Sequence, residues 1–289
     1  MAKELTHILI AQDVLRRLRD KQPLLAGIIQ RNASAYYLGS IFPDALFYAC
    51  PPFCLHPGKY LRISKALHHE KAARNNQTAM GLFNSISSAP HMWPEKLAFS
   101  VGIITHTVAD RTFHDLIAHY NNAWNEAGAE AMGTHREMET FIDMALLKQR
   151  NIHPRDFRLG RYIAMDPRTE RVLHHFYLAY VTRNNRISSH SLIHVLKRAA
   201  HQQCFFSRLF AARPMYHITR IANRVVSNHL RLWHALFYPD TEAAESFLFL
   251  NKLRAADSHP FDPNRLSLHT DAASVEAIRC INLSVLNLA

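Results

Sequence analysis

Three polar residues recur at every fourth position next to an apolar stretch, and this spacing constrains the fold more than any other feature of the chain. His106, Asp110 and His114 follow the apolar segment 97–104. Four residues turn a helix by about 400°, so successive members of the series are displaced by only about 40° and all three lie near one face. The spacing therefore predicts a largely buried helix with a polar stripe. Buried His and Asp side chains need partners, and one metal ion serves several of them at once.

A second pair of a histidine and an acid follows with the same spacing. His135 and Glu139 are four residues apart near the start of the next expected helix, after a linker of small residues over 126–133. A short linker keeps the end of one helix near the start of the next, so we expect both groups to converge on one polynuclear metal site. The alternative is a salt-bridged helix face, in which Asp110 pairs with Arg111 or with a neighbouring helix.

Composition and periodicity both predict an all-α fold. Only 8 of the 289 residues are glycine, and few β-branched runs alternate with polar residues; both facts favour helices over strands. Pro43 is expected to stop the third helix, and Thr134 with Glu137 forms a capping box expected to open the sixth. Helical periodicity covers the ranges 6–20, 23–32, 34–41, 64–86, 94–121, 134–149, 167–183, 188–212, 214–237, 240–255 and 272–284.

We expect these helices to form a single domain over residues 1–289, with the polynuclear metal site in its helical core. Residues 1–150 would be the half that carries the metal ligands, and residues 151–289 a basic helical half. The second half contains a further pair, His190 and His194, which we expect to be structural because no carboxylate stands at ligand spacing from it. Three aromatic residues in its apolar stripes are expected in the core: Phe205, Phe206 and Trp233.

Three further candidates lie upstream of the first group. His7 falls in the first turn of the first expected helix. Asp44 follows Pro43 in an otherwise apolar run, where an unpaired carboxylate would be costly to bury; its alternative role is a helix cap. His68 and His69 are the third candidate, and because adjacent helical residues point about 100° apart, we expect only one of them to face the site.

The order of these residues resembles the zinc-dependent phospholipase C family. This family includes the catalytic domain of glycosylphosphatidylinositol phospholipase D and is structurally similar to single-strand nucleases of the S1/P1 type. The resemblance covers about residues 5–145. It is carried by Thr6-His-Ile-Leu-Ile-Ala, Gly39-Ser-Ile-Phe-Pro-Asp, Leu67-His, Phe99-Ser-Val-Gly-Ile-Ile-Thr-His-Thr-Val-Ala-Asp-Arg-Thr-Phe-His and His135-Arg-Glu-Met-Glu.

The resemblance implies an all-α fold around a cluster of two or three zinc ions. It carries eight residues over as metal ligands: His7, Asp44, His68, His106, Asp110, His114, His135 and Glu139. It also suggests that Asp44 both holds metal and orients the attacking nucleophile. The chain departs from similar secreted bacterial members in one respect: they place a processed N-terminal tryptophan on one zinc ion, whereas this chain begins Met1-Ala2.

A zinc cluster of this kind predicts a phosphoesterase. Two or three zinc ions bridge a phosphate, lower the pKa of a bound water to about 7 and neutralise the leaving alkoxide. We therefore expect a phospholipase C-type phosphodiesterase acting by attack of zinc-bound hydroxide. One alternative is a metal-dependent nuclease or nucleotidase, which would need aromatic platforms such as Tyr36, Tyr37 or Phe53 to stack bases. Another is a weakly active protein in which zinc stabilises a binding module.

The charge of the chain favours anionic partners. The formal net charge is +11, and residues 151–239 hold 14 Arg and Lys against 3 Asp and Glu. Such a surface suits a phospholipid substrate, an anionic membrane surface or nucleic acid; the alternative is a solvated basic face. No uncharged apolar stretch of roughly 20 residues is present, so no membrane span is expected. The segment Met1–His7 lacks the apolar core of a signal peptide, so we expect a cytoplasmic protein.

Overall fold

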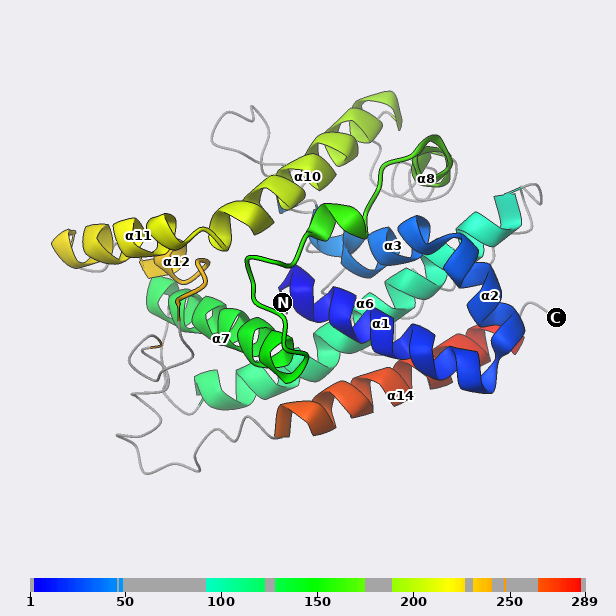
Figure 1. The fold of residues 1–289 in the computed structure, drawn as a ribbon, viewed down its shortest axis with the longest axis horizontal. Helices are drawn as coiled ribbons and strands as arrows, with labels where there is room; N and C mark the ends of the chain where they lie inside the picture. The colour runs from blue at the N-terminus through cyan, green and yellow to red at the C-terminus, as the bar shows by residue number, and fades with distance from the viewer. Residues whose placement is uncertain are drawn as a thin grey trace. The chain divides into compact units, whose positions relative to one another are not determined.

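The computed structural model describes residues 3–45, 47–48, 92–122, 128–174, 189–226, 231–240, 247 and 265–286. Within these ranges every regular element is a helix (Figure 1), which confirms the all-α fold predicted from the sequence. No helix in the same ranges is long and apolar enough to cross a membrane.

The chain forms two compact units, each assembled from separate segments. Unit 1 consists of Met1–Thr6, Asp110–Arg158 and Phe205–Ala272, and unit 2 of His7–Ala109, Leu159–Cys204 and Ala273–Ala289. The organisation as a single domain with halves 1–150 and 151–289 stays a prediction. The helices are α1 (Glu4–Lys21), α2 (Pro23–Arg31), α3 (Ala33–Ala45), α6 (Trp93–Asn122), α7 (Gly128–Gln149), the 3-10 helix η3 (Leu159–Arg161), α8 (Pro167–Val172), α10 (Ser189–Phe210), α11 (Arg213–Val225), α12 (Arg231–His234) and α14 (Arg265–Leu286).

Most predicted helices lie where the periodicity placed them, but two local signals were misread. Helix α3 continues through Pro43 to Ala45, because a proline removes only one backbone donor and the eight residues Leu38–Ala45 are all buried. Helix α7 begins at Gly128, so Thr134 lies inside it and does not cap it. Its hydroxyl instead accepts a hydrogen bond from Arg231 at 2.7 Å, a contact that the local sequence does not reveal.

Other boundaries also differ from the prediction. The expected helix over 214–237 is described as two helices, α11 and α12, and α14 begins at Arg265, before the predicted residue 272. The expected helices over 64–86 and 240–255, and the second half of 167–183, lie outside the described residues.

Unit 2 contains a close crossing of α3 and α6 at two glycines. A Cβ on Gly39 would lie 2.2 Å from the carbonyl oxygen of Phe99, and a Cβ on Gly102 would lie 2.2 Å from that of Tyr36. Only glycine permits backbones to approach this closely. The rings of Phe42 and Phe99 pack edge to face beside the crossing, 5.7 Å apart.

Unit 1 contains buried polar contacts between its N-terminal segment, α7 and Tyr238. The Nζ of Lys3 lies 4.2 Å from the ring centre of Tyr238 and donates a 2.5 Å hydrogen bond to the carbonyl of Leu236. Asp143 accepts hydrogen bonds from the backbone N–H and the hydroxyl of Thr6, at 2.8 and 2.5 Å, and from the Tyr238 hydroxyl at 2.6 Å. Burial lowers the pKa of Lys3 to about 8 and raises the pKa of Asp143 to about 7. The attraction between the two groups shifts each pKa in the opposite direction, but burial has the larger effect.

Candidate metal centre

Three of the predicted ligands meet in the interior of unit 2. His7 comes from α1, Asp44 from the last turn of α3 and His106 from the middle of α6, and their potential ligand atoms all lie within 4.8 Å of one another. The Nε2 atom of His7 is 3.5 Å from an Oδ atom of Asp44, and the rings of His7 and His106 stack with centres 4.1 Å apart. His7, His106 and Asp44 are exposed by only 0, 2 and 4%.

The glycine crossing accounts for this meeting. His106 follows Gly102 by one helical turn, and Ser40, next to Gly39, precedes Asp44 by one turn. The close approach of the two backbones therefore brings the next turn of α6 beside the next turn of α3. His106 reaches the carbonyl oxygen of Ser40 through its Nδ1 atom, at 2.9 Å.

This hydrogen bond fixes the tautomer of His106. A carbonyl oxygen only accepts, so Nδ1 carries the proton and donates it to Ser40. The lone pair then resides on Nε2, which is the form in which that atom can bind a metal. Histidines that bind metals generally donate their other N–H in this way to a carbonyl or carboxylate, which orients the ring.

The first group fits a zinc ion by its donors and spacing. Two imidazole nitrogens and one carboxylate oxygen are a common zinc donor set, and ligands about 2.1 Å from one tetrahedral ion lie roughly 3.4 Å apart. The 3.5 Å separation between His7 and Asp44 matches that value, and the ligand atoms of all three residues lie within 4.8 Å of one another. Three protein ligands also leave a fourth position, which is the arrangement of catalytic zinc sites rather than of closed structural ones.

Four further predicted ligands form a second group in unit 1. Asp110 and His114, one turn apart on α6, lie 3.4 Å from each other, and His135 and Glu139, one turn apart on α7, lie 3.0 Å from each other. The rings of His114 and His135 are tilted, with centres 5.3 Å apart. The members of this group therefore come from two helices, as the sequence predicted for the pairs.

The protonation states of the second group suit metal binding. Burial lowers the pKa of His114 to about 4 despite the nearby Asp110, so its ring is neutral at pH 7, the form that binds metals. Burial alone would raise the pKa of Glu139, but Arg136 and His135 more than offset it and hold that pKa well below its ordinary value. The Arg136 guanidinium donates to Glu139 at 2.8 Å, so the carboxylate is ionised and oriented.

Sequence reasoning missed the residues that support these groups. These supporting groups are Gly39, Gly102, the Ser40 carbonyl and Arg136. Each acts through contacts that the sequence does not reveal. The one signal in the sequence was that they stand close to the candidate ligands along the chain. The eighth candidate, His68, and its alternative His69 lie outside the described residues.

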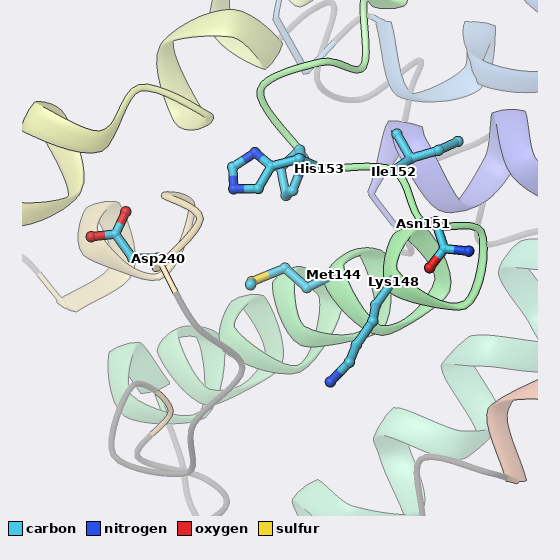
Figure 2. A pocket seen from close by; sticks show the side chains of 7 residues that line it. Met144, Lys148, Asn151, Ile152, His153 and Asp240 are labelled. Carbon is cyan, nitrogen blue, oxygen red and sulfur yellow. The ribbon is translucent and has the colours of Figure 1, made fainter.

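A pocket of about 420 Å³ in unit 1 is lined by none of the eight candidate ligands (Figure 2). It lies at the C-terminal end of α7 and includes Met144, Lys148, His153 and Asp240. The Asp240 carboxylate is already bound by two arginines and a histidine: Arg155 and Arg213 at 2.8 Å, and His217 at 3.1 Å.

Comparison with known proteins supports the resemblance seen in the sequence. No curated protein and no solved structure matches the chain significantly. A family model described as zinc dependent phospholipase C matches residues 6–194, well over half of the chain. That range contains all eight residues of the predicted ligand series. The chain therefore belongs to the zinc-dependent phospholipase C family.

Proposed function

We propose that this protein is a phospholipase C-type phosphodiesterase that requires two or three zinc ions. Family membership supports a zinc hydrolase of this general type. The observation that carries the proposal for this chain is the buried group of His7, Asp44 and His106, whose donor atoms lie within 4.8 Å of one another.

The proposed ligands are the eight residues of the predicted series. In unit 2, His7, Asp44 and His106 would hold one ion; in unit 1, the ionised Glu139 and the neutral His114 support metal binding by their protonation states. The remaining proposed ligands are His68, Asp110 and His135.

Bound zinc would supply Lewis acidity toward the phosphate and lower the pKa of water in the site. Asp44 is the proposed catalytic residue, because it is a carboxylate at the end of α3 within reach of two imidazoles. It would accept a hydrogen bond from the attacking water and orient it toward phosphorus. The Ser40 carbonyl accepts the hydrogen bond from Nδ1 of His106, and this bond keeps the ring in one orientation.

A phospholipid is the proposed substrate class. The chain carries a formal net charge of +11, which favours anionic phosphodiesters in general. Single-stranded nucleic acid would need exposed aromatic rings on which bases stack. Tyr36 is fully buried, with its hydroxyl bonded to the Ala11 carbonyl, and the half-buried Tyr37 packs edge-on against Tyr162; Phe53 lies outside the described residues.

A comparison of substrates tests this proposal. Purified protein should hydrolyse phosphatidylglycerol, an anionic phospholipid, in mixed micelles faster than single-stranded DNA, and EDTA should abolish the hydrolysis until zinc is added back. His106→Ala should lose at least a hundredfold in rate. The matched control is His201→Ala, because His201 also bonds a backbone carbonyl through Nδ1 but is exposed. Preferential hydrolysis of DNA, or activity unaffected by EDTA, would refute the proposal.

A further inference from the structure

Helix α11 presents its apolar side to solvent and its polar side to the protein. Ile218, Ile221 and Val225 are exposed by 57, 64 and 76%. The buried residues of the helix are Tyr216 and Asn223. An ordinary surface helix has the opposite arrangement, with its apolar stripe against the core.

The exposed residues form one continuous stripe. At 100° per residue, Ile218, Ile221 and Val225 fall within about 60° of one another, and the exposed Pro214 lies within the same arc. We call these four residues the α11 stripe. Asn223 lies on the opposite side of the helix, roughly 180° from the middle of the stripe.

Polar contacts fix the helix in this orientation. The Thr219 hydroxyl lies 3.1 Å from Nδ1 of His234 on α12, and the ring of Tyr216 packs on the same histidine with centres 4.9 Å apart. Rotating α11 to bury its stripe would break these contacts and expose Tyr216. The outward stripe is therefore a property of the folded unit, and an apolar patch of this kind marks an interaction surface.

The flank of the stripe is cationic. Arg213, Arg220 and Arg224 fall within about 40° of one another on the adjoining side of the helix. Asp240 neutralises part of the charge at Arg213, but α11 itself contains no acidic residue, and none occurs from residue 171 to residue 239. On α12, which contacts α11, Trp233 is 55% exposed.

We infer that the α11 stripe docks this protein onto an anionic phospholipid bilayer. Apolar side chains at the outer face would enter the boundary between headgroups and acyl chains, while the arginines would lie at the level of the lipid phosphates. Tryptophan favours the same boundary, because its ring is apolar and its N–H is polar. Docking of this kind would also present phospholipid to the enzyme, and that role rests on the proposed function. The docking itself does not depend on it.

Charge favours a bilayer over a second copy of the chain as the occupant. A symmetric dimer through this face would place the same acid-free cationic helix on both sides of the interface. Like charges would then oppose one another along the contact. An anionic bilayer instead complements the arginines and covers the apolar stripe.

Vesicle co-sedimentation of the whole zinc-loaded chain tests the inference. The protein should bind phosphatidylcholine vesicles containing phosphatidylserine at 0.05 M salt, and bind pure phosphatidylcholine vesicles at least tenfold more weakly. The stripe variant Ile218→Ser/Ile221→Ser/Val225→Ser should lower binding at least tenfold. Arg220→Gln/Arg224→Gln should lower it severalfold and reduce its dependence on salt.

The matched control uses exposed apolar residues of α14. Leu268, Val275 and Leu283 are exposed by 66, 52 and 50%, but α14 also carries Asp271 and Glu276. Leu268→Ser/Val275→Ser/Leu283→Ser should bind like the unmodified protein. Circular dichroism and melting temperature check that each variant is folded, and these exposed positions favour retention of the fold.

Three results would overturn the inference. They are no binding of the unmodified protein to anionic vesicles at low salt, full binding by the folded stripe variant, and a dimer in solution that the stripe variant abolishes. Hydrolysis of a soluble short-chain phosphodiester is measured in parallel. If the stripe variant keeps that activity and loses vesicle binding, docking and catalysis are separable; if no variant hydrolyses any phosphodiester, the proposed function fails while the binding result stands.

Discussion

Two glycines decide how closely α3 and α6 approach, and therefore where the side chains of the candidate metal centre lie. The Cα of Gly39 is 2.9 Å from where a Cβ of Gly102 would stand. One turn beyond this crossing, His106 reaches the Ser40 carbonyl and lies beside His7. Without side chains of their own, these glycines position the residues of the centre.

Gly102→Ala should destabilise the protein and weaken zinc binding. Its Cβ would stand 2.2 Å from the Tyr36 carbonyl oxygen, so the two helices would have to separate. We expect a loss of about 2–4 kcal/mol in the free energy of unfolding, measured by urea denaturation, and loss of zinc from the unit 2 group.

Gly27→Ala on α2 is the matched control for that change. The nearest atom to its Cβ would be Nη1 of Arg31 at 3.7 Å, an ordinary contact. Replacing a helical glycine by alanine in open space should raise stability by about 0.5–1 kcal/mol and leave zinc content unchanged. Similar effects from the two substitutions would mean that the crossing does not position the site.

Among the helices of unit 1, buried polar contacts hold the N-terminal segment to α7 and α11 to α12. Lys3 and Asp143 are both buried, and three donors from Thr6 and Tyr238 converge on the carboxylate. On α12, His234 contacts the Thr219 hydroxyl of α11 through its Nδ1 atom and packs against the Tyr216 ring. Such contacts are costly to break because each leaves a buried polar group without its partner.

Asp143→Ala should therefore cost about 2–4 kcal/mol of stability, because the buried donors of Thr6 and Tyr238 lose their acceptor. Thermal or urea unfolding measures this loss. Glu276→Ala is the control: it breaks an ion pair of 2.7 Å with Arg279 on the surface of α14, which is worth at most about 1 kcal/mol. Equal losses in the two variants would contradict the importance of these buried hydrogen bonds.

Acid should weaken the contact between α11 and α12. Burial first, and then the charges of Arg220 and Arg224, lower the pKa of His234 to about 4 from its ordinary 6.5. Because the folded state favours the neutral ring, its stabilising contribution is full above about pH 6.5 and is lost as the pH falls toward 4.

We expect His234 to contribute about 1–2 kcal/mol to this loss, since its ring is only half-buried and solvent screens part of the effect. Urea unfolding at pH 7.5 and pH 4.5 measures it. His234→Gln should show a smaller loss of stability between those pH values than the unmodified protein. An unchanged pH dependence in the variant would contradict this role of His234.

For the molecule as far as it is described, the sequence predicted the helical class, most helix positions and three candidate ligands that the structure brings together: His7, Asp44 and His106. Periodicity sufficed for α1, α2 and α6 because their apolar spacing persists over many residues. It failed where contacts with distant parts of the chain determine the helix boundaries. Pro43 stays within α3 because the end of that helix is buried. Thr134 lies inside α7, where its hydroxyl accepts a hydrogen bond from Arg231. The glycine crossing was unpredictable because glycine alone says nothing about which backbone approaches it.

Periodicity also fails to say which way a stripe faces. Phe205 and Trp233 were expected in the core, yet they are 61 and 55% exposed, and Phe206 is only half-buried. That prediction was wrong for the two exposed residues. An apolar stripe seen in sequence fixes the period of a helix, but the polar contacts of its other side decide its orientation, as α11 shows.

Zinc should stabilise the whole folded chain, because its ligands come together only on folding. Stripping the metal with EDTA should lower the melting temperature by roughly 5–15 °C, and zinc should restore it; a ligand at 100 to 1,000 times its Kd stabilises by about 3–4 kcal/mol. Differential scanning calorimetry measures the change. An identical melting temperature with and without EDTA would contradict coupling between zinc and folding.

The zinc content of purified protein, measured by elemental analysis, tests the metal centre most directly. Protein prepared without chelator should contain two or three zinc ions per chain, and His106→Ala should contain at least one fewer, while His201→Ala should match the unmodified protein. Less than one zinc ion per chain in the unmodified protein, or equal loss in His106→Ala and His201→Ala, would contradict the proposed site.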